Sequence, residues 1–258
     1  MPQSRRFHLP AVALSLALSL APGQAVLAQT QAMGPQDGAA AAEPAPATQA
    51  DQALHALYTQ EWEWRQREFQ REKIDGRWQA SGRMPSIAAE DWERRAGYWK
   101  QVLEALDAIT PDALSPQERV NAAVFRSMLE ADYNSATWRT WEAPFNSDSF
   151  FWGYLVPRQP YAREADWERL FGRLRDLPRH FDQHIANMEQ GLARGWSVPR
   201  VSIEGRDRTI EPYTRIDAGN PFLASIEAMP ASIPEPRRSQ LQAEGRRQIG
   251  RASCRERV

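Results

Sequence analysis

The chain has 258 residues, of which 42% are hydrophobic and 25% are charged, and it can form one large domain or two small ones. Its formal net charge is −1 at pH 7 and it has no long basic run, so it lacks the electrostatic footprint of a nucleic-acid-binding protein. No apolar run reaches the roughly 18–20 residues that a membrane-spanning helix needs. We therefore expect neither a nucleic-acid partner nor a membrane span.

Residues 1–28 have the three parts of a secretory signal peptide. Arg5 and Arg6 precede an apolar stretch over residues 9–21, and the small residues of the sequence AVLA follow a Pro-Gly break. We expect cleavage after Ala28 and a secreted protein, in the periplasm of a Gram-negative bacterium. Whether export uses the Sec or the twin-arginine route stays open.

Residues 29–50 are rich in Ala, Pro and Gln and have almost no large apolar side chain. Such a segment cannot bury enough apolar surface to offset the entropy lost on ordering. We expect a disordered linker.

The helical pattern starts at Asp51. Apolar residues recur every three or four positions over 51–69 and again over 87–106, which predicts two helices, the first with Asp51 as its N-cap. A third helix has a strong start signal in Ser115, Pro116 and Glu118, which fit the N-cap, first-turn and capping-box positions. Its expected inner face consists of Val120, Val124, Met128 or Leu129, and Tyr133.

Aromatic residues and prolines crowd the stretch 138–161, which predicts a long ordered loop. Its rings can pack on the helices or stack on a ligand, and both uses stay open. A fourth helix follows, in which Pro178 should produce a kink or a break and Gly195 should follow the last turn. Its expected core stripe is Phe171, Leu174, Leu177, Phe181, Ile185, Met188 and Leu192.

Beyond this helix the pattern is weaker. A short β-like run covers Val201–Ile203, and a last helix is expected from about Pro234 to the chain end. The predicted fold class of the body is all-α.

One arrangement of residues could bind a metal. His180 and His184 lie four apart, so on a helix they face the same side. A zinc hydrolase of the HExxH type has a glutamate after the first histidine, and here that position is Phe181, which cannot act as a base. Because no complete catalytic constellation is present, we assign no catalytic, cofactor-binding or metal residue in this chain and expect the two histidines to have a packing or surface role.

The stretch HFDQHIANMEQGLARGWSVPRV (180–201) resembles the bacterial "domain of unknown function 885" proteins. The segments LSPQERVNAAVFRSMLE (114–130), NPF (220–222) and MPASIP (229–234) agree with that family in order and spacing. The resemblance covers most of residues 51–248.

This resemblance implies an exported, mostly helical protein similar to zinc metallopeptidases, with a deep channel and a peptide-like substrate. The HExxH helix of that family lies downstream of the region matched here, so residues 51–248 would be the N-terminal part of a larger fold. Zinc is expected in the intact protein and no cofactor in this part of it.

The last ten residues, IGRASCRERV (249–258), resemble residue for residue the translation of a common sequencing-adapter read. We expect them to be an artefactual tail that packs on nothing, which would make Cys254 artefactual and the chain a truncated gene product.

Two functional hypotheses follow. In the first, the chain is the N-terminal part of an exported, zinc-dependent, peptidase-like hydrolase. In the second, it is a periplasmic module that binds cell-wall glycan or peptide with the aromatic residues of 138–161. Exposed and coplanar rings of Trp141, Trp152 and Tyr154 would favour this hypothesis, and buried rings would remove it.

Overall fold

The computed structural model describes residues 47–145 and 151–255, and in this range it leaves aside the side chains of 151–152 and 251–255. These residues lie in one compact unit, Pro46–Val258. Helices dominate, and the one sheet among the described residues has two strands, so the predicted all-α class is confirmed. The predicted signal peptide and most of the predicted linker lie outside the described residues. In the part of the chain that is described, no helix combines the length and the apolar character needed to cross a membrane.

The first half of the unit has three long helices and a hairpin: α1 (Gln49–Glu68), β1 (Arg71–Ile74), β2 (Arg77–Ala80), α2 (Ala89–Asp107) and α3 (Pro116–Thr137), with a short 3-10 turn, η1 (Pro111–Ala113), before α3. The first two residues of helix α1 fall within the predicted linker, which was expected to end at residue 50. Its N-cap is Thr48, and Asp51 is the third helical residue and completes a capping box with Thr48, so the prediction of Asp51 as N-cap is wrong by three positions.

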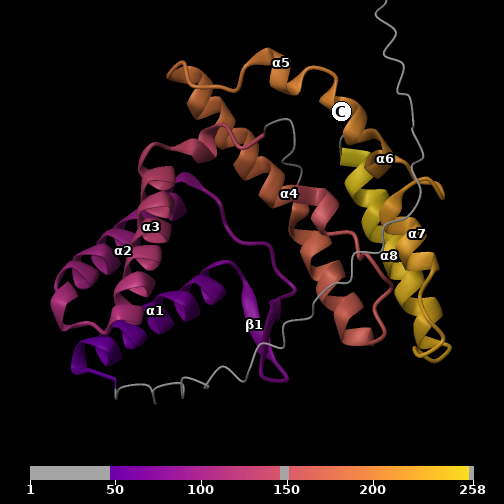
Figure 1. Cartoon of the computed structure of the whole chain (residues 1–258). Coiled ribbons are helices and arrows are strands. Elements are labelled where there is room, and N and C mark those ends of the chain that lie inside the picture. The colour runs from indigo at the N-terminus through magenta and orange to yellow at the C-terminus, as the bar shows by residue number, and fades with distance from the viewer. Residues whose placement is uncertain (1–46, 146–150, 256–258) are drawn as a thin grey trace, which may run out of the picture. The chain divides into compact units, whose positions relative to one another are not determined.

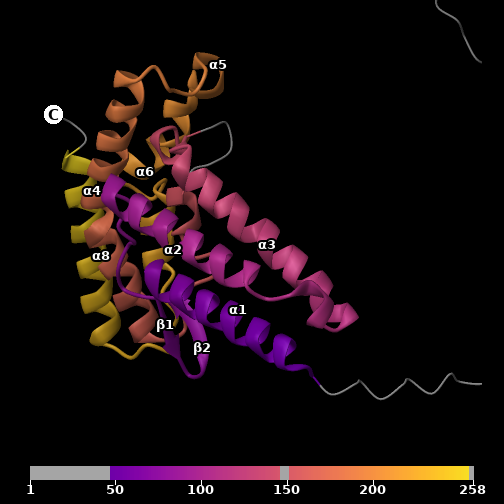
Figure 2. The same cartoon turned by 90° about the vertical axis from the view of Figure 1, so that its left-hand side faces the viewer.

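The hairpin is built on a two-residue turn. Asp75 and Gly76 both have positive φ angles, +50° and +77°, as a type I′ turn requires. The strands pair antiparallel, with Lys73 opposite Trp78, and Figure 2 shows them beside α1. This element was not predicted, although Asp-Gly between short alternating runs is a strong hairpin signal.

Helices α1, α2 and α3 share one hydrophobic core and lie side by side in Figure 1. Its buried members are Leu54, Trp99, Val102, Leu106, Leu114, Phe125, Leu129 and Ala136.

The start of α3 is confirmed, and its predicted inner face is confirmed at Leu129 and Tyr133 but wrong at Val120, Val124 and Met128. The Ser115 hydroxyl accepts a hydrogen bond from the backbone N–H of Glu118, and Pro116 is the first helical residue. However, Val120, Val124 and Met128 are 58%, 56% and 49% exposed. The helix has two apolar stripes, and the one that contains Phe125 and Leu129 faces α2.

The second half contains α4 (Glu164–Ala193), preceded by the 3-10 turns η2 (Thr140–Glu142) and η3 (Phe151–Tyr154) and followed by α5 (Arg200–Ile203), η4 (Arg206–Thr209), α6 (Glu211–Thr214), α7 (Pro221–Glu227) and α8 (Arg237–Arg255). Helices α7 and α8 lie along α4 (Figure 1) and close a second core with it. Residues 201–203 form a helical turn, so the β-like interpretation was wrong.

Pro178 does not divide α4, which runs unbroken through 30 residues. A proline in a helix removes one backbone hydrogen bond, but burial of the flanking Leu174 and Leu177 in the second core favours the continuous helix. The predicted core stripe is confirmed at Phe171, Leu174 and Leu177, and the half-buried Phe181 packs against the same core. It is wrong at Ile185 and Leu192, which are 49% and 64% exposed.

The last helix carries a buried face into the predicted tail. Leu241, Gly245 and Ile249 recur every four residues, and Ile249 is only 4% exposed within the second core. The prediction that nothing from residue 249 onward packs on the body is therefore wrong at Ile249. The origin of residues 249–258 stays a prediction.

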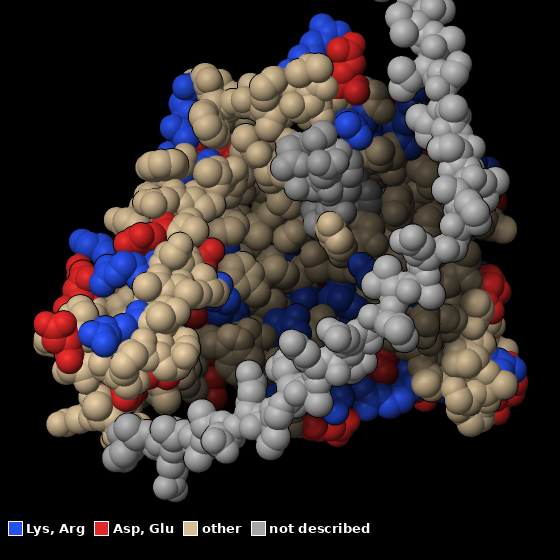
Figure 3. All heavy atoms as spheres, in the orientation of Figure 1, with Lys and Arg blue, Asp and Glu red and all other residues tan. Residues whose placement is uncertain are grey.

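Arginine–carboxylate pairs link α8 to its neighbours. Arg175 Nη1 lies 2.9 Å from Glu244 Oε1, and Arg246 Nε lies 2.6 Å from Glu227 Oε1. Such exposed pairs contribute about 0–1 kcal/mol each, so the apolar core contributes most of the stability. On the face in Figure 3, basic and acidic side chains lie close to one another, as this pairing requires.

Candidate functional site on helix α4

The two histidines of α4 lie together at the end of the second core. Their ring centroids are 4.9 Å apart and the rings are perpendicular, at 89°. His180 is 5% exposed, and its Nδ1 lies 3.1 Å from the backbone carbonyl oxygen of Pro85. Because a carbonyl only accepts, His180 Nδ1 carries the proton. The Phe145 ring lies 5.3 Å from His184.

Both imidazoles are held neutral. Burial lowers the pKa of His184 to about 4, with a smaller contribution from His180. Burial also lowers the pKa of His180, against the opposing effect of the Pro85 carbonyl. Among the described residues, no group of three or more His, Cys, Asp or Glu side chains could hold a metal ion. His180 donates to the backbone, and His184 contacts the rings of His180 and Phe145. The expected packing or surface role of the pair stays a prediction.

Other polar side chains of α4 bind the backbone of the 83–87 segment, which joins the hairpin to α2. Asp176 Oδ2 accepts hydrogen bonds from the Met84 backbone N–H at 2.9 Å and from Arg83 Nε at 2.7 Å. Arg179 Nη2 donates to the Met84 carbonyl oxygen at 2.8 Å. Burial alone would raise the pKa of Asp176, but the bonds from Arg83 and Met84 outweigh it and hold the pKa below its ordinary value.

Two more polar side chains on the same face of α4, one and two turns beyond Arg179, also bind this segment. Gln183 Oε1 accepts from the Ile87 backbone N–H at 3.2 Å, and its Nε2 donates to Ser86 Oγ at 2.9 Å. Asn187 Nδ2 donates to the Ile87 carbonyl oxygen at 2.7 Å, and this bond is buried. The 83–87 segment has no regular secondary structure, so its backbone groups need such partners wherever they are buried.

On its other side, the segment is tied to the first core through Arg95. This arginine is 1% exposed, and its Nε lies 2.8 Å from Glu68 Oε1. Its Nη2 donates to the Ser86 carbonyl oxygen, and its guanidinium carbon lies 4.9 and 4.7 Å from the ring centroids of Phe69 and Trp92. Burial lowers the pKa of Arg95 and Glu68 opposes this, but an arginine stays protonated at any physiological pH.

A polar pocket of about 320 Å³ opens beside Arg95. Most guanidinium nitrogens in its lining are engaged. Arg94 forms a forked pair with Glu68, at 2.8 and 2.7 Å, and a third bond to Asp91 at 2.8 Å. The buried Nη1 of Arg95 has no hydrogen-bond partner among the described residues. The pocket can take polar groups, but its charges are largely balanced internally. Its lining residues are Trp64, Arg67, Glu68, Gln70, Ser86, Asp91, Arg94 and Arg95.

The end of α4 is fixed by a close approach of η2. A Cβ added at Gly191 would lie 2.8 Å from the Trp196 carbonyl oxygen and 3.0 Å from Glu142 Cβ. The Glu142 carboxylate is fully buried and pairs with Arg194. Gly195 follows with φ +78°, and this confirms the predicted helix end.

The exposed rings that would favour the second functional hypothesis are not all found in the aromatic stretch. Trp141 is 6% exposed, and its Nε1 donates to the Ala136 carbonyl oxygen at 3.2 Å. Tyr154 is 77% exposed, while the Trp152 side chain lies outside the described residues. Trp141 therefore cannot stack on a ligand as the second functional hypothesis requires.

Sequence reasoning singled out the histidines and missed Gln183, Asn187 and Glu142. A signal was present, because Gln183 and Asn187 belong to the string FDQHIANM, in which they share a helix face with His180 and His184. Nothing in the sequence indicated their hydrogen-bond partner, because the 83–87 segment lies about 100 residues away in the chain.

Comparison with known families gives one match. Residues 71–255 match the family model described as "Bacterial protein of unknown function (DUF885)". No curated protein and no solved structure matches the chain.

Proposed function

Because the chain belongs to this DUF885 family, we propose that residues 51–248 are the N-terminal helical part of an exported, zinc-dependent, peptidase-like hydrolase. In this proposal the helices form part of the wall of a channel for a peptide-like substrate. The catalytic HExxH region belongs to polypeptide outside residues 51–248.

The observation that supports this proposal best is a pair of uncovered apolar helix faces. On α3, Val120, Val124 and Met128 follow one another at intervals of one turn and are about half exposed or more. On α4, Ile185 and Leu192 continue the core stripe beyond the point where α7 and α8 cover it. Contiguous exposed apolar faces mark surfaces that meet further polypeptide or line a groove.

The described residues do not fit the expected zinc. A hydrolytic zinc site uses about three protein ligands, an open position and a nearby base. His180 binds the Pro85 carbonyl through Nδ1, which leaves only Nε2 to bind a metal. Phe181 stands in the base position, and among the described residues no group of three or more His, Cys, Asp or Glu side chains could hold a metal ion. In this proposal the zinc ligands belong to the HExxH region.

The direct test is to sequence genomic DNA through codon 248 and beyond, and to assay the encoded protein for peptide cleavage with and without a zinc chelator. We expect a reading frame that continues into an HExxH helix, and cleavage that the chelator abolishes. A continuous frame without HExxH would contradict the assignment to zinc peptidases.

The 258-residue chain provides the matched control. With added zinc it should cleave no peptide. Turnover by this chain that is lost in His180→Ala would mean that the histidine pair is catalytic after all.

The proposed location is the periplasm, and it depends on residues 1–28 acting as a signal peptide. Fractionation of cells that express the chain should find it in the periplasm, processed after Ala28. A matched variant with Arg5 and Arg6 both changed to Glu should stay unprocessed in the cytoplasm. Equal processing of both chains would contradict the signal prediction.

A further inference from the structure

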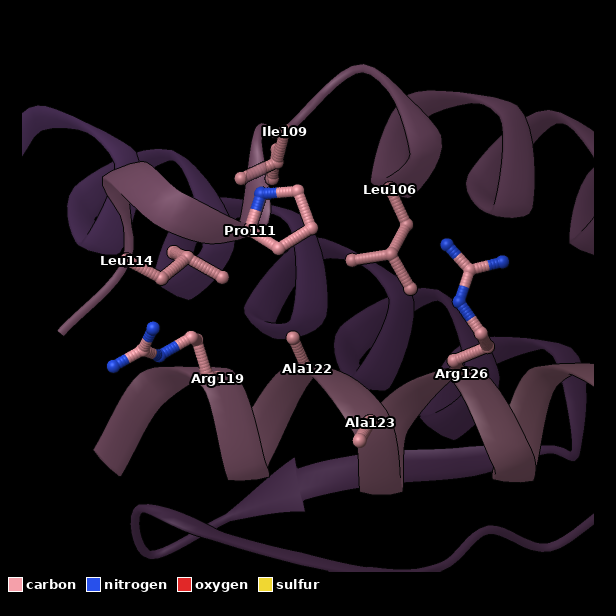
Figure 4. A pocket seen from close by; sticks show the side chains of 8 residues that line it. All are labelled: Leu106, Ile109, Pro111, Leu114, Arg119, Ala122, Ala123 and Arg126. Atoms are coloured by element: carbon pink, nitrogen blue, oxygen red, sulfur yellow. The ribbon is translucent and has the colours of Figure 1, made fainter. Parts of the chain in front are cut away.

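A second pocket lies at the far end of the first core, between the end of α2, the η1 turn and the first half of α3. Its volume is about 250 Å³. Figure 4 shows eight side chains around it, six of them apolar. These lining residues are Leu106, Ile109, Pro111, Leu114, Arg119, Ala122, Ala123 and Arg126.

The apolar part of this pocket is continuous with the core. Leu106 and Leu114 are 4% and 6% exposed and belong to the core of the first three helices. The apolar lining residues on the α3 side are Ala122 and Ala123. Their side chains are single methyl groups, which leaves the pocket open between α3 and the leucines. A branched apolar group can therefore enter the pocket and contact the side chains of Leu106 and Leu114.

The two arginines of the lining differ in whether a carboxylate pairs with them. Figure 4 shows them at opposite ends of the row of apolar side chains. Arg126 is paired, since its Nη2 donates to Asp107 Oδ1 and its Nη1 lies 3.8 Å from Glu130. Arg119 is exposed, and it has no carboxylate within salt-bridge distance among the residues that the structure describes.

We propose that this pocket binds a small carboxylate ligand with a branched apolar body, whose carboxylate pairs with Arg119. The single unpaired guanidinium fits one carboxylate, since a guanidinium fork matches the geometry of two carboxylate oxygens. The apolar majority of the lining excludes a ligand as polar as inorganic phosphate. The volume is below the range of about 300–1,000 Å³ found for drug-sized ligands, so the bound part is about the size of one amino-acid residue.

This chemistry is shared by an N-acylated apolar amino acid and by the C-terminal apolar residue of a peptide. The proposal does not depend on the hydrolase function, because it concerns equilibrium binding to the chain as it is.

The test uses N-acetyl-L-leucine and its neutral amide, N-acetyl-L-leucinamide, as matched probes. Binding is followed by the backbone NMR shifts of Ala122 and Ala123 in the 258-residue chain. We expect saturable shifts with the acid, and affinity at least about fivefold lower for the amide because the ion pair is lost. Added salt should weaken binding of the acid and leave the amide unchanged. Equal binding of acid and amide would overturn the proposal.

Three variants locate the site. Arg119→Gln should weaken binding of the acid about fivefold and bring it to the level of the amide. Arg208→Gln, at an exposed arginine of η4 without an ion pair among the described residues, is the matched control and should change nothing. Ala122→Phe, at the alanine whose methyl group points toward Leu106 and Pro111 in Figure 4, should fill the pocket and abolish binding of both probes. Full affinity in Ala122→Phe, with its helical circular dichroism unchanged, would place the binding elsewhere and refute the proposal.

A third probe, the peptide Gly-Gly-Leu, distinguishes the two candidate ligands, an N-acylated amino acid and the C-terminus of a peptide. Tighter binding than that of N-acetyl-L-leucine identifies a peptide C-terminus as the ligand. Equal or weaker binding identifies a single acylated amino acid. No binding of any of the three probes at millimolar concentration would overturn the proposal.

Discussion

The side-chain amide nitrogen of Asn187 lies 2.7 Å from the backbone carbonyl oxygen of Ile87, and both residues are buried. This bond joins the middle of α4 to the segment that leads into α2. It belongs to a row of such bonds, in which Gln183 and His180 bind Ile87 N–H and Pro85 C=O. The string by which the chain resembles its family thus holds an irregular segment in place.

Asn187→Ala should destabilise the protein by about 1–3 kcal/mol, because the Ile87 carbonyl would stay buried without its donor. Urea unfolding followed by circular dichroism measures the change. The control is Glu189→Ala, an exposed position on the same helix, which should stay within about 0.5 kcal/mol of the parent. Equal stability of all three proteins would mean that water replaces the amide without loss.

Gly191→Ala should destabilise the protein by about 1–3 kcal/mol through overpacking, since the new methyl group would lie 2.8 Å from the Trp196 carbonyl oxygen. The matched control is Gly97→Ala in α2, where nothing lies within 4 Å of the added Cβ. There the change should stabilise by up to about 1 kcal/mol, because alanine has the better helix propensity. If both substitutions stabilise, η2 moves away from α4 at little cost.

Stability should fall as the pH falls from 6.5 toward about 4. The pKa of His184 in the folded protein is about 4, against an ordinary value of 6.5, so in this window the unfolded chain binds more protons than the folded one. The contribution is fully present above pH 6.5, and its loss amounts to about 1–3 kcal/mol. His180, whose pKa burial also lowers, adds to the effect. Carboxylates with a lowered pKa, such as Asp176 and Glu227, contribute at the acid end of the window, near their ordinary values of 3.8 and 4.5, and Asp132, whose pKa burial raises, acts in the opposite direction. The comparison with a His184 variant isolates the contribution of His184.

Urea unfolding at several pH values checks this prediction. His184→Phe should show a shallower decline than the parent between pH 6.5 and 4, because one protonation site is removed. Identical pH profiles would show that His184 titrates normally in the folded protein.

Two identical substitutions on α4 should differ strongly in their cost. Leu170 has no exposed surface and Leu192 is 64% exposed. Leu170→Ala should cost about 2–5 kcal/mol in unfolding free energy, and Leu192→Ala close to zero. A large loss at Leu192 in the isolated chain would mean that its face is covered in solution, by a second copy for example, and a dependence of the melting temperature on protein concentration would then reveal it.

Much of the helical architecture could be read from the sequence, because its signals are local. Ser115 and Pro116 begin α3 as predicted, and Gly195 follows α4 in the left-handed conformation as predicted. Each depends on the backbone groups within one turn of chain. The Asp75–Gly76 turn was equally local, and the hairpin could have been predicted from it.

Which apolar face is buried was decided by the tertiary structure. Val124 and Phe125 are neighbours on α3, yet one is 56% and the other 8% exposed. Periodicity assigns both to apolar stripes, and only the position of α2 selects between them. In the same way, Ile249 is buried because α7 and α8 lie together, and a pattern within the last ten residues could not indicate this.

The candidate site shows the same division. The sequence by itself determined that His180 and His184 share a helix face and that Phe181 removes the base of a zinc-hydrolase motif. The tertiary structure decided that His180 donates to Pro85, 95 residues away, and that the two histidine rings lie against each other. A side chain's chemistry is fixed locally, whereas its partner is selected by contacts between segments far apart in the chain, and these contacts form only when the helices pack.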